Sequence, residues 1–312
     1  MIFNSYHWVF QQESRPYRVA QILRLPVTLS LFHSANPPPA AVLTLSPGQH
    51  TTMIGDIHGH LTGLPGSTAT ERMARLMAIA ERMGIERQCV CMGLNFHYDP
   101  NPEDLRKQND ECLEALAHHH DQALGLVYLN PKHTEASLAE LERCVAQGPM
   151  VGVKLWVAVR CSSRLLDPLV ERAAELHAPI MQHTWYKTTG NLPGESTSAD
   201  LAELAARHPK AQFVCGHSGG DWQLGLQTLR HSPNVVVETG GFDPTTGCVE
   251  MAVRELGVER VIFGSDVPGR SYASQLAKVR GAEIEEFERR MILRDNLRRL
   301  LRPILESKGM RP

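Results

Sequence analysis

The stretch GDIHGHL, Gly55 to Leu61, follows a short apolar lead and organises the interpretation of the whole chain. In an extended conformation Asp56, His58 and His60 occupy alternate positions, and side chains two residues apart on a strand point to the same face. Two imidazoles presented together can bind a zinc-like ion if one or two further ligands arrive from elsewhere. His-X-His alone is a weak signal, because a pair of surface or core histidines explains it more often than a metal site does.

Composition limits the class of protein. The balance of 42% hydrophobic and 21% charged residues is that of a soluble globular chain, and a net charge of −2 without a basic stripe argues against nucleic acid as a partner. No apolar run approaches the roughly 18 residues that a membrane span requires. Seven scattered cysteines in apolar surroundings indicate reduced thiols in the cytosol better than disulfides. We expect a cytoplasmic protein with a small-molecule substrate; a homo-oligomer is compatible with the sequence.

Residues 1–52 differ from the remainder of the chain. An apolar segment, residues 25–32, is preceded by arginines and followed by a run of three prolines, residues 37–39. As a signal peptide it is poorly formed, because the apolar part is short and Pro26 interrupts its start. No helical or strand period continues through these residues. We expect a disordered or loosely attached extension, with Met53 as the natural start of the protein.

From residue 53 onward, short apolar runs alternate with segments of helical period. Strands are predicted over residues 53–57, 89–94, 123–129, 151–156, 179–183, 212–216, 235–238 and 260–264. Helices are predicted over residues 70–83, 103–118, 135–146, 165–177, 198–207, 222–230 and 246–256, with a last helical region over 284–305. Eight strands of this kind predict one (β/α)8 barrel over residues 53–312. The competing architecture, a doubly wound open sheet, requires a glycine-rich phosphate loop after the first strand, and GDIHGHL is not such a loop.

Ionisable residues recur where the predicted strands end, which in a barrel is one common mouth. Taken singly each has an ordinary explanation, such as a solvated histidine, a lysine reaching water or an aspartate capping a turn. Together they are costly to bury in one cavity unless they are paired or bind a metal. Histidine and carboxylate are ligands of zinc, manganese and iron, so a metal site is predicted. Besides His58 and His60, the strand-end residues are Lys154, His183, His217, Glu238 and Asp266.

The order of these residues, His-X-His first, then two single histidines and a final aspartate, resembles the amidohydrolase superfamily. The resemblance is strongest to its amidohydrolase-2 branch, which includes decarboxylases, hydratases and lactonases acting on small carboxylic acids. FGSDVPGR, residues 263–270, resembles the eighth-strand signature of that branch, and DNLRRLL, residues 295–301, resembles its closing helix. The resemblance covers residues 53–301 and implies a barrel that carries a metal.

The resemblance implies that His58, His60, His183 and Asp266 hold one divalent ion, with zinc as the first expectation and manganese or iron as alternatives. It also implies catalytic roles for two residues. Asp266 would move the proton of a metal-activated water, and His217 would polarise the substrate carbonyl or orient that water. In binuclear members of the superfamily a carboxylated lysine at the position of Lys154 bridges two ions. In that alternative His183 and His217 bind the second ion; one ion is favoured over two.

Other residues are candidates for contacting the metal ligands or the substrate. Hydrogen-bond partners of the ligand histidines are expected, and Asp56 and Glu238 are candidates for this role. Arg160 and Arg270 are candidates for binding a substrate carboxylate, since guanidinium grips one with two hydrogen bonds, although a surface role explains each equally well. Trp185 is a candidate for the pocket wall, with packing as its alternative.

The predicted function is a metal-dependent hydrolase of a small molecule, cleaving an amide or lactone bond. One alternative is a metal-dependent non-oxidative decarboxylase of a small carboxylic acid, which would use the same ligands. A second alternative is a catalytically silent barrel that binds a metal or ligand.

Overall fold

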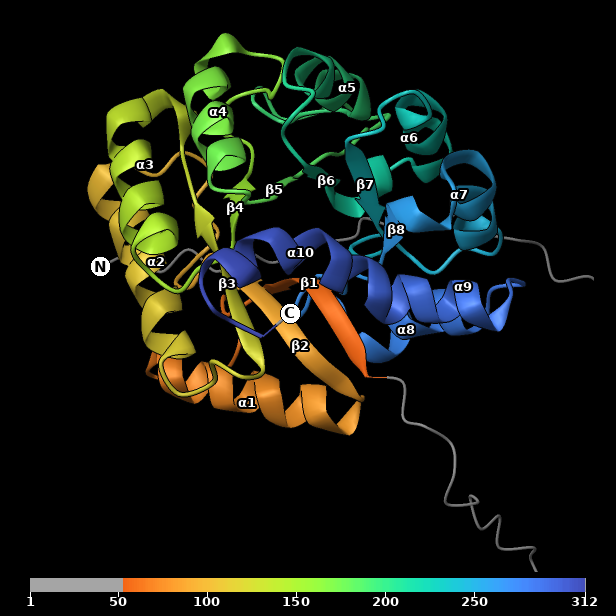
Figure 1. Ribbon diagram of the computed structural model, residues 1–312, viewed down its shortest axis with the longest axis horizontal. Helices are drawn as coiled ribbons and strands as arrows, with labels where there is room; N and C mark the ends of the chain where they lie inside the picture. Colours follow the sequence, from red (N-terminus) through yellow and green to blue (C-terminus); the bar gives the residue numbers. More distant parts are fainter. Residues whose placement is uncertain (1–52, 312) are drawn as a thin grey trace, which may run out of the picture. The chain divides into compact units, whose positions relative to one another are not determined.

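The computed structural model describes residues 53–311, so the prediction for residues 1–52 lies outside the described residues. Eight parallel strands pair in sequence order, β1 to β8, and form a nearly closed barrel (Figure 1). This order confirms the predicted barrel, because in a doubly wound sheet the sequence order of neighbouring strands reverses at an internal strand. The strands are β1 Ile54–His60, β2 Ile85–Cys91, β3 Ala123–Tyr128, β4 Gly152–Leu155, β5 Ile180–Gln182, β6 Phe213–Cys215, β7 Val235–Glu238 and β8 Val261–Ile262.

Helices surround the strands on the outside (Figure 1). They are α1 Ala69–Arg82, α2 Pro102–Leu116, α3 Thr134–Leu141, α4 Asp167–Glu175, α5 Ser198–Arg207, α6 Trp222–Leu229, α7 Cys248–Leu256, α8 Tyr272–Arg280, α9 Glu286–Arg290 and α10 Asn296–Ser307. Single π-helical turns extend α3 over Glu142–Ala146 and join α9 to α10 over Met291–Asp295. Within residues 53–311 none of these helices combines the length and apolar character that crossing a bilayer demands.

Side-chain caps explain where several helices begin. Thr68 accepts a hydrogen bond from the backbone of α1, and Asn101 does the same for α2. Thr197 and Asp200 form a reciprocal capping box at the start of α5. Each cap satisfies backbone N–H groups that have no partner inside the helix. The predicted and observed bounds of α5 therefore coincide.

The helix α8 was not predicted from the sequence. A single helical region, residues 284–305, was predicted after the eighth strand, and the structure has α9 and α10 there with an additional helix, α8, before them. The segment YASQLAKVR of α8 buries two polar residues, Gln275 and Lys278, so its apolar period is weak. Lys278 Nζ donates a hydrogen bond to Thr239 O at 2.7 Å, and this contact compensates its burial.

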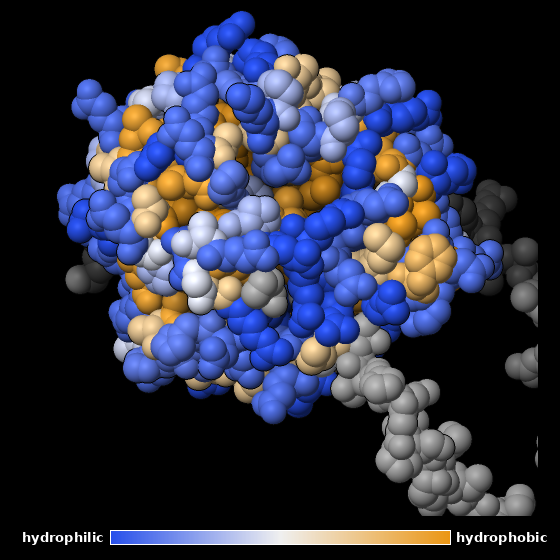
Figure 2. Space-filling model, viewed as in Figure 1, coloured by the Kyte–Doolittle hydropathy of each residue, from blue (hydrophilic) through white to orange (hydrophobic). Residues whose placement is uncertain are grey.

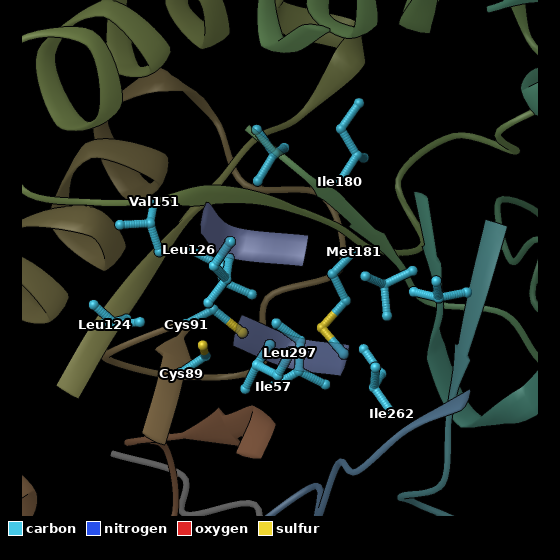
Figure 3. Packing of buried hydrophobic residues seen from close by; sticks show 14 of the residues in the cluster. Ile57, Cys89, Cys91, Leu124, Leu126, Val151, Ile180, Met181, Ile262 and Leu297 are labelled. Carbon is cyan, nitrogen blue, oxygen red and sulfur yellow. The ribbon is translucent and has the colours of Figure 1, made fainter. Parts of the chain in front are cut away.

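The barrel closes between β1 and the segment that follows β8. Asp266 N donates to His58 O at 2.8 Å, and His60 N donates to Val267 O at 2.7 Å. Ile57, Cys91 and Met181 gather in the apolar interior (Figure 3), and all seven cysteines are free and buried, as predicted. At the amino ends of the strands α10 crosses β1, with Leu297 so close to Gly55 that a β-carbon there would lie 2.8 Å from it. The opposite end is left open as the mouth.

Candidate metal centre

Three predicted ligands meet at the carboxyl ends of β1 and β8. His58 and His60 project from β1, and their Nε2 atoms lie 3.1 Å apart. Asp266 Oδ1 lies 3.5 Å from Nε2 of His58 and 3.3 Å from Nε2 of His60. Each of the three residues offers one potential ligand atom, and these atoms all lie within 4.8 Å of one another. This is a donor set that a divalent ion can bind.

Backbone contacts hold this set together. Asp56 accepts hydrogen bonds from the backbone N–H groups of His58 at 2.9 Å and Ser265 at 3.0 Å, and from the Ser265 hydroxyl. Burial raises the pKa of Asp56 to about 7, although these hydrogen bonds oppose the rise. Asp56 thus joins β1 to the segment carrying Asp266. It holds the backbone of His58, one of the ligand histidines for which it was a candidate partner.

Acceptors behind the two β1 histidines fix their tautomers. Nδ1 of His58 lies 3.2 Å from Oε1 of Glu238, as the predicted role of Glu238 requires. Nδ1 of His60 lies 3.3 Å from the carbonyl oxygen of Cys91. A carboxylate or carbonyl oxygen only accepts, so Nδ1 carries the proton in both rings. If both rings are neutral, the facing Nε2 atoms each carry a lone pair. Burial lowers the pKa of His60, but Cys91 and Asp266 raise it to about 9, so near pH 7 and without a metal its Nε2 also carries a proton.

The same arrangement recurs at the other two histidines. Nε2 of His183 lies 3.1 Å from Oε1 of Glu195, and Nδ1 of His217 lies 3.2 Å from the carbonyl oxygen of Gly240. Nδ1 of His183 and Nε2 of His217 then face each other at 3.1 Å, again as two lone pairs. Burial lowers the pKa of His217 to about 3, so its ring is neutral near pH 7. A cation between the facing nitrogen atoms, either a proton on one ring or a metal ion, stabilises each of the two pairs.

The structure brings the four predicted ligands together only in part. His183 lies against His217 and outside the close group formed by His58, His60 and Asp266. Burial raises the pKa of Asp266, but positive charge on His58 and a hydrogen bond from His60 outweigh burial and hold this pKa below its usual range, so the carboxyl is ionised. An ionised oxygen beside these rings is suited to a cation, either a proton on a ring or a metal ion.

Lys154 is buried in β4 at the centre of the mouth. Its Nζ lies 3.0 Å from Nε2 of His58, directly beside the group of three ligands. An ammonium group there donates to the His58 lone pair when no metal competes for it. The position also suits the alternative in which a carboxylated lysine contacts two ions, so both predicted metal counts keep a geometric basis.

Beside these ligands lies a pocket of about 280 Å³ with an aromatic wall. Phe96 and Tyr98 follow β2, and each packs on Trp156, with ring centroids 5.7 and 4.7 Å apart. Trp185 stacks on His183 with an interplanar angle of 18° and also lines the pocket, as predicted for it. Sequence reasoning missed Phe96, Tyr98 and Trp156, although all three follow strand ends and that position was the available signal.

The two candidate arginines have different surroundings. Arg270 lines the pocket together with Asp266. Arg160 does not line it: its Nε donates to Pro193 O at 3.4 Å, and its Nη1 lies 3.9 Å from Asp200. The loop after β4 turns this side chain away, so its predicted contact with substrate is not supported. Glu195 is the reverse case, a residue that sequence reasoning missed because it lies in the long loop after β5.

Solved structures with a similar fold include decarboxylases and a hydratase. A 2,6-dihydroxybenzoate decarboxylase from Rhizobium is 19% identical, with a TM-score of 0.63, covering 80% of this chain and 99% of that one. A manganese-bound dihydroxybenzoic acid decarboxylase from Polaromonas is 18% identical, with a TM-score of 0.63 and coverage of 81% and 98%. A 4-oxalomesaconate hydratase from Rhodopseudomonas palustris is 18% identical, with a TM-score of 0.61 and coverage of 82% and 98%. At these identities the likeness shows the fold.

The family itself is shown by a sequence match over most of the chain. A model of the amidohydrolase family, of the amidohydrolase-2 type, matches residues 56–302, which include every residue of the mouth described above. The chain therefore belongs to the amidohydrolase family of metal-dependent enzymes.

Proposed function

We propose that the protein is a metal-dependent hydrolase of a small molecule, cleaving an amide or lactone bond. The observation that carries this proposal is the pairing of imidazole nitrogen atoms, with an acceptor on the far side of each ring. His58, His60 and Asp266 would hold one divalent ion, with His183 as a further ligand. A divalent ion bound there polarises a carbonyl and lowers the pKa of a bound water toward about 7.

Two residues are placed to handle protons. The Asp266 side chain is ionised and 21% exposed to the pocket, so it can accept a proton from the attacking water and return it to the leaving group. His217 is held by Gly240, which leaves Nε2 as a proton acceptor that can orient water or substrate. Arg270 lies on the same pocket and would bind a substrate carboxylate.

The test combines metal content with turnover. Elemental analysis of the purified protein is expected to find one equivalent of zinc, manganese or iron, and a panel of lactones and amides is expected to include a substrate. Asp266→Asn should abolish turnover while His58 and His60 retain metal. Metal in both proteins with no turnover in either, on any substrate, would favour the alternative of a silent metal-binding barrel.

A second candidate is a non-oxidative decarboxylase, supported by the aromatic wall. Phe96, Tyr98 and Trp156 suit a planar ring, and Arg270 suits its carboxylate. Several proteins of the same fold are decarboxylases of aromatic acids. Release of CO2 from aromatic or unsaturated acids, in the absence of lactone or amide cleavage, would select this candidate.

Metal count is tested separately at Lys154. Substitution Lys154→Gln removes the group that would carry a bridging carboxylate, while Lys132→Gln, an exposed lysine, is the matched control. With one ion per chain, Lys154→Gln should keep the stoichiometry of the wild type. A fall from two equivalents to one in this variant alone would establish the two-ion alternative.

A further inference from the structure

A second group of charged side chains lies at the amino ends of the strands, away from the metal centre. Arg87 is in β2, opposite Gly55 of β1. Glu86, Arg87 and Arg298 line a cavity of about 540 Å³ and also a small hollow beside it. Arg311 lines the cavity and Arg294 lines the hollow. We call Arg87, Arg294, Arg298 and Arg311 the amino-face arginines.

Hydrophilic residues occupy the middle of this face, where α10 crosses the strands (Figures 1 and 2). Arg298 is the second residue after the start of α10, and Arg294 belongs to the π-helical turn before it. The helix that closes the barrel thus brings two guanidinium groups beside Arg87. These three arginines meet because of the fold, since β2 and α10 are about 200 residues apart in the chain.

Few acidic groups balance this charge. Glu86 pairs with Arg298 at 3.0 Å, and Asp121 is the other carboxylate lining the cavity. Within residues 53–311, the side chains of Arg87 and Arg294 form no hydrogen bond or ion pair. Burial closes Nε of Arg294 to any ligand, so an acceptor from another source can reach only the parts of these two side chains that line the hollow and the cavity.

Residues 1–52 carry little negative charge that could serve as this acceptor. Residues 1–52 contain one acidic residue, Glu13, against three arginines. Burial lowers the pKa of Arg87, and the neighbouring Arg298 and Arg311 lower it further, as expected where positive groups crowd one another. Among residues 53–311, the amino-face arginines therefore lack a counter-charge of equal size.

We propose that the amino-face arginines bind a phosphate-type oxyanion, either free phosphate or the phosphoryl group of a small metabolite. Guanidinium forks match the oxygen spacing of such anions and form paired, charge-assisted hydrogen bonds. The cavity has about eighteen times the volume of one water molecule, which leaves room for an organic part beside the phosphoryl group. Chemistry in this fold takes place at the carboxyl ends of the strands, so the anion is a stabilising or regulatory ligand.

The experiment measures binding and thermal stability of the full-length, metal-loaded protein. Inorganic phosphate and glycerol phosphate are titrated by calorimetry, and the melting temperature is followed against sodium chloride at equal ionic strength. A ligand of the native state raises the melting temperature as its concentration increases. Arg87→Gln and Arg294→Gln should each weaken phosphate binding about tenfold or more.

Two control variants carry the same change of charge. Arg302→Gln alters an exposed residue of α10 that lines neither space, and Arg270→Gln alters the pocket at the metal centre. Both should bind phosphate as the wild type does. Loss of binding in Arg270→Gln alone would place the anion at the metal centre and overturn the proposal, whatever the outcome for hydrolase activity.

The melting temperature without phosphate distinguishes a binding role of Arg87 from a structural one. Arg87→Gln removes repulsion between positive groups, so its melting temperature should equal or exceed that of the wild type until phosphate is added. A purely structural role for Arg87 predicts a lower melting temperature in both conditions. Tighter binding of glycerol phosphate would indicate a metabolite, and equal binding would indicate free phosphate. No binding by the wild type above the salt control, or full binding by the Arg87→Gln/Arg294→Gln variant, disproves the site.

Discussion

The carboxylate of Glu238 connects both halves of the metal centre, so Glu238→Gln is the most informative single change. Oε1 accepts from Nδ1 of His58 at 3.2 Å and from the backbone N–H of His217, and Oε2 accepts from the backbone N–H of Gly240. The glutamine amide has one oxygen and one NH2 group. In either orientation the NH2 group faces a buried N–H donor, which loses its acceptor.

The magnitude follows from these three contacts. A buried donor left without an acceptor costs about 1–3 kcal/mol, and hydrogen bonds that lose their charge-assisted character weaken by about 1 kcal/mol each. We therefore expect Glu238→Gln to lower the free energy of unfolding of the metal-free protein by about 3–5 kcal/mol. Metal affinity should fall about 10- to 100-fold, because His58 loses the partner that orients its ring.

Chemical denaturation measures the first quantity, and competition with a chelator of known affinity measures the second. Glu135→Gln, an exposed residue of α3, provides the control for the change of charge. If Glu238→Gln matched this control in both stability and metal affinity, the carboxylate would not hold the ligand histidines, and the assignment of their tautomers would be wrong.

Three further changes test other parts of the centre. Gly241→Ala would bring a β-carbon within 1.8 Å of Nδ1 of His217 at a backbone φ of 85°; turnover should fall about 100-fold while elemental analysis still finds the wild-type metal content. Burial raises the pKa of Glu195, but hydrogen bonds from His183 and Lys187 lower it from 4.5 to about 2. A lowered carboxyl pKa stabilises the fold above about pH 4.5, and this contribution is lost as pH falls toward 2, so Glu195→Gln should flatten the melting temperature across that range. Removal of metal by a chelator should abolish turnover and lower the melting temperature, and an added divalent ion should restore both.

The barrel and its mouth were predictable from the sequence because strands that are buried on both faces have continuously apolar sequences. Strands such as residues 235–238 are continuously apolar until an ionisable residue ends them, and the carboxyl ends of all eight strands lie at one end of a barrel. That rule alone brings His58, His217 and Asp266 to a common site. It does not give the direction of a side chain in a loop, and for this reason Arg160 points to Asp200 and away from the pocket.

Most of the acceptors that contact the ligand rings could not be predicted from the sequence. Two of them are the carbonyl oxygens of Cys91 and Gly240, and every residue has such an oxygen. A third, Glu195, lies in a loop whose path depends on tertiary contacts, including a short parallel bridge between Thr184 and Ser196. Only Glu238 ends a strand, so only Glu238 was predicted.

Backbone strain at the mouth connects this geometry to catalysis. Within the described residues, both proposed catalytic residues have left-handed backbone, with φ of 61° at His217 and 59° at Asp266, and Ser218 has φ of 47°. Such a conformation costs a non-glycine residue about 1–3 kcal/mol, so three in one site require strong compensation. The hydrogen bonds of Asp56 and Glu238 lie on the backbone of these same segments. Asp56 and Glu238 thus hold the catalytic residues in a costly conformation, and Glu238 also orients the ring of His58.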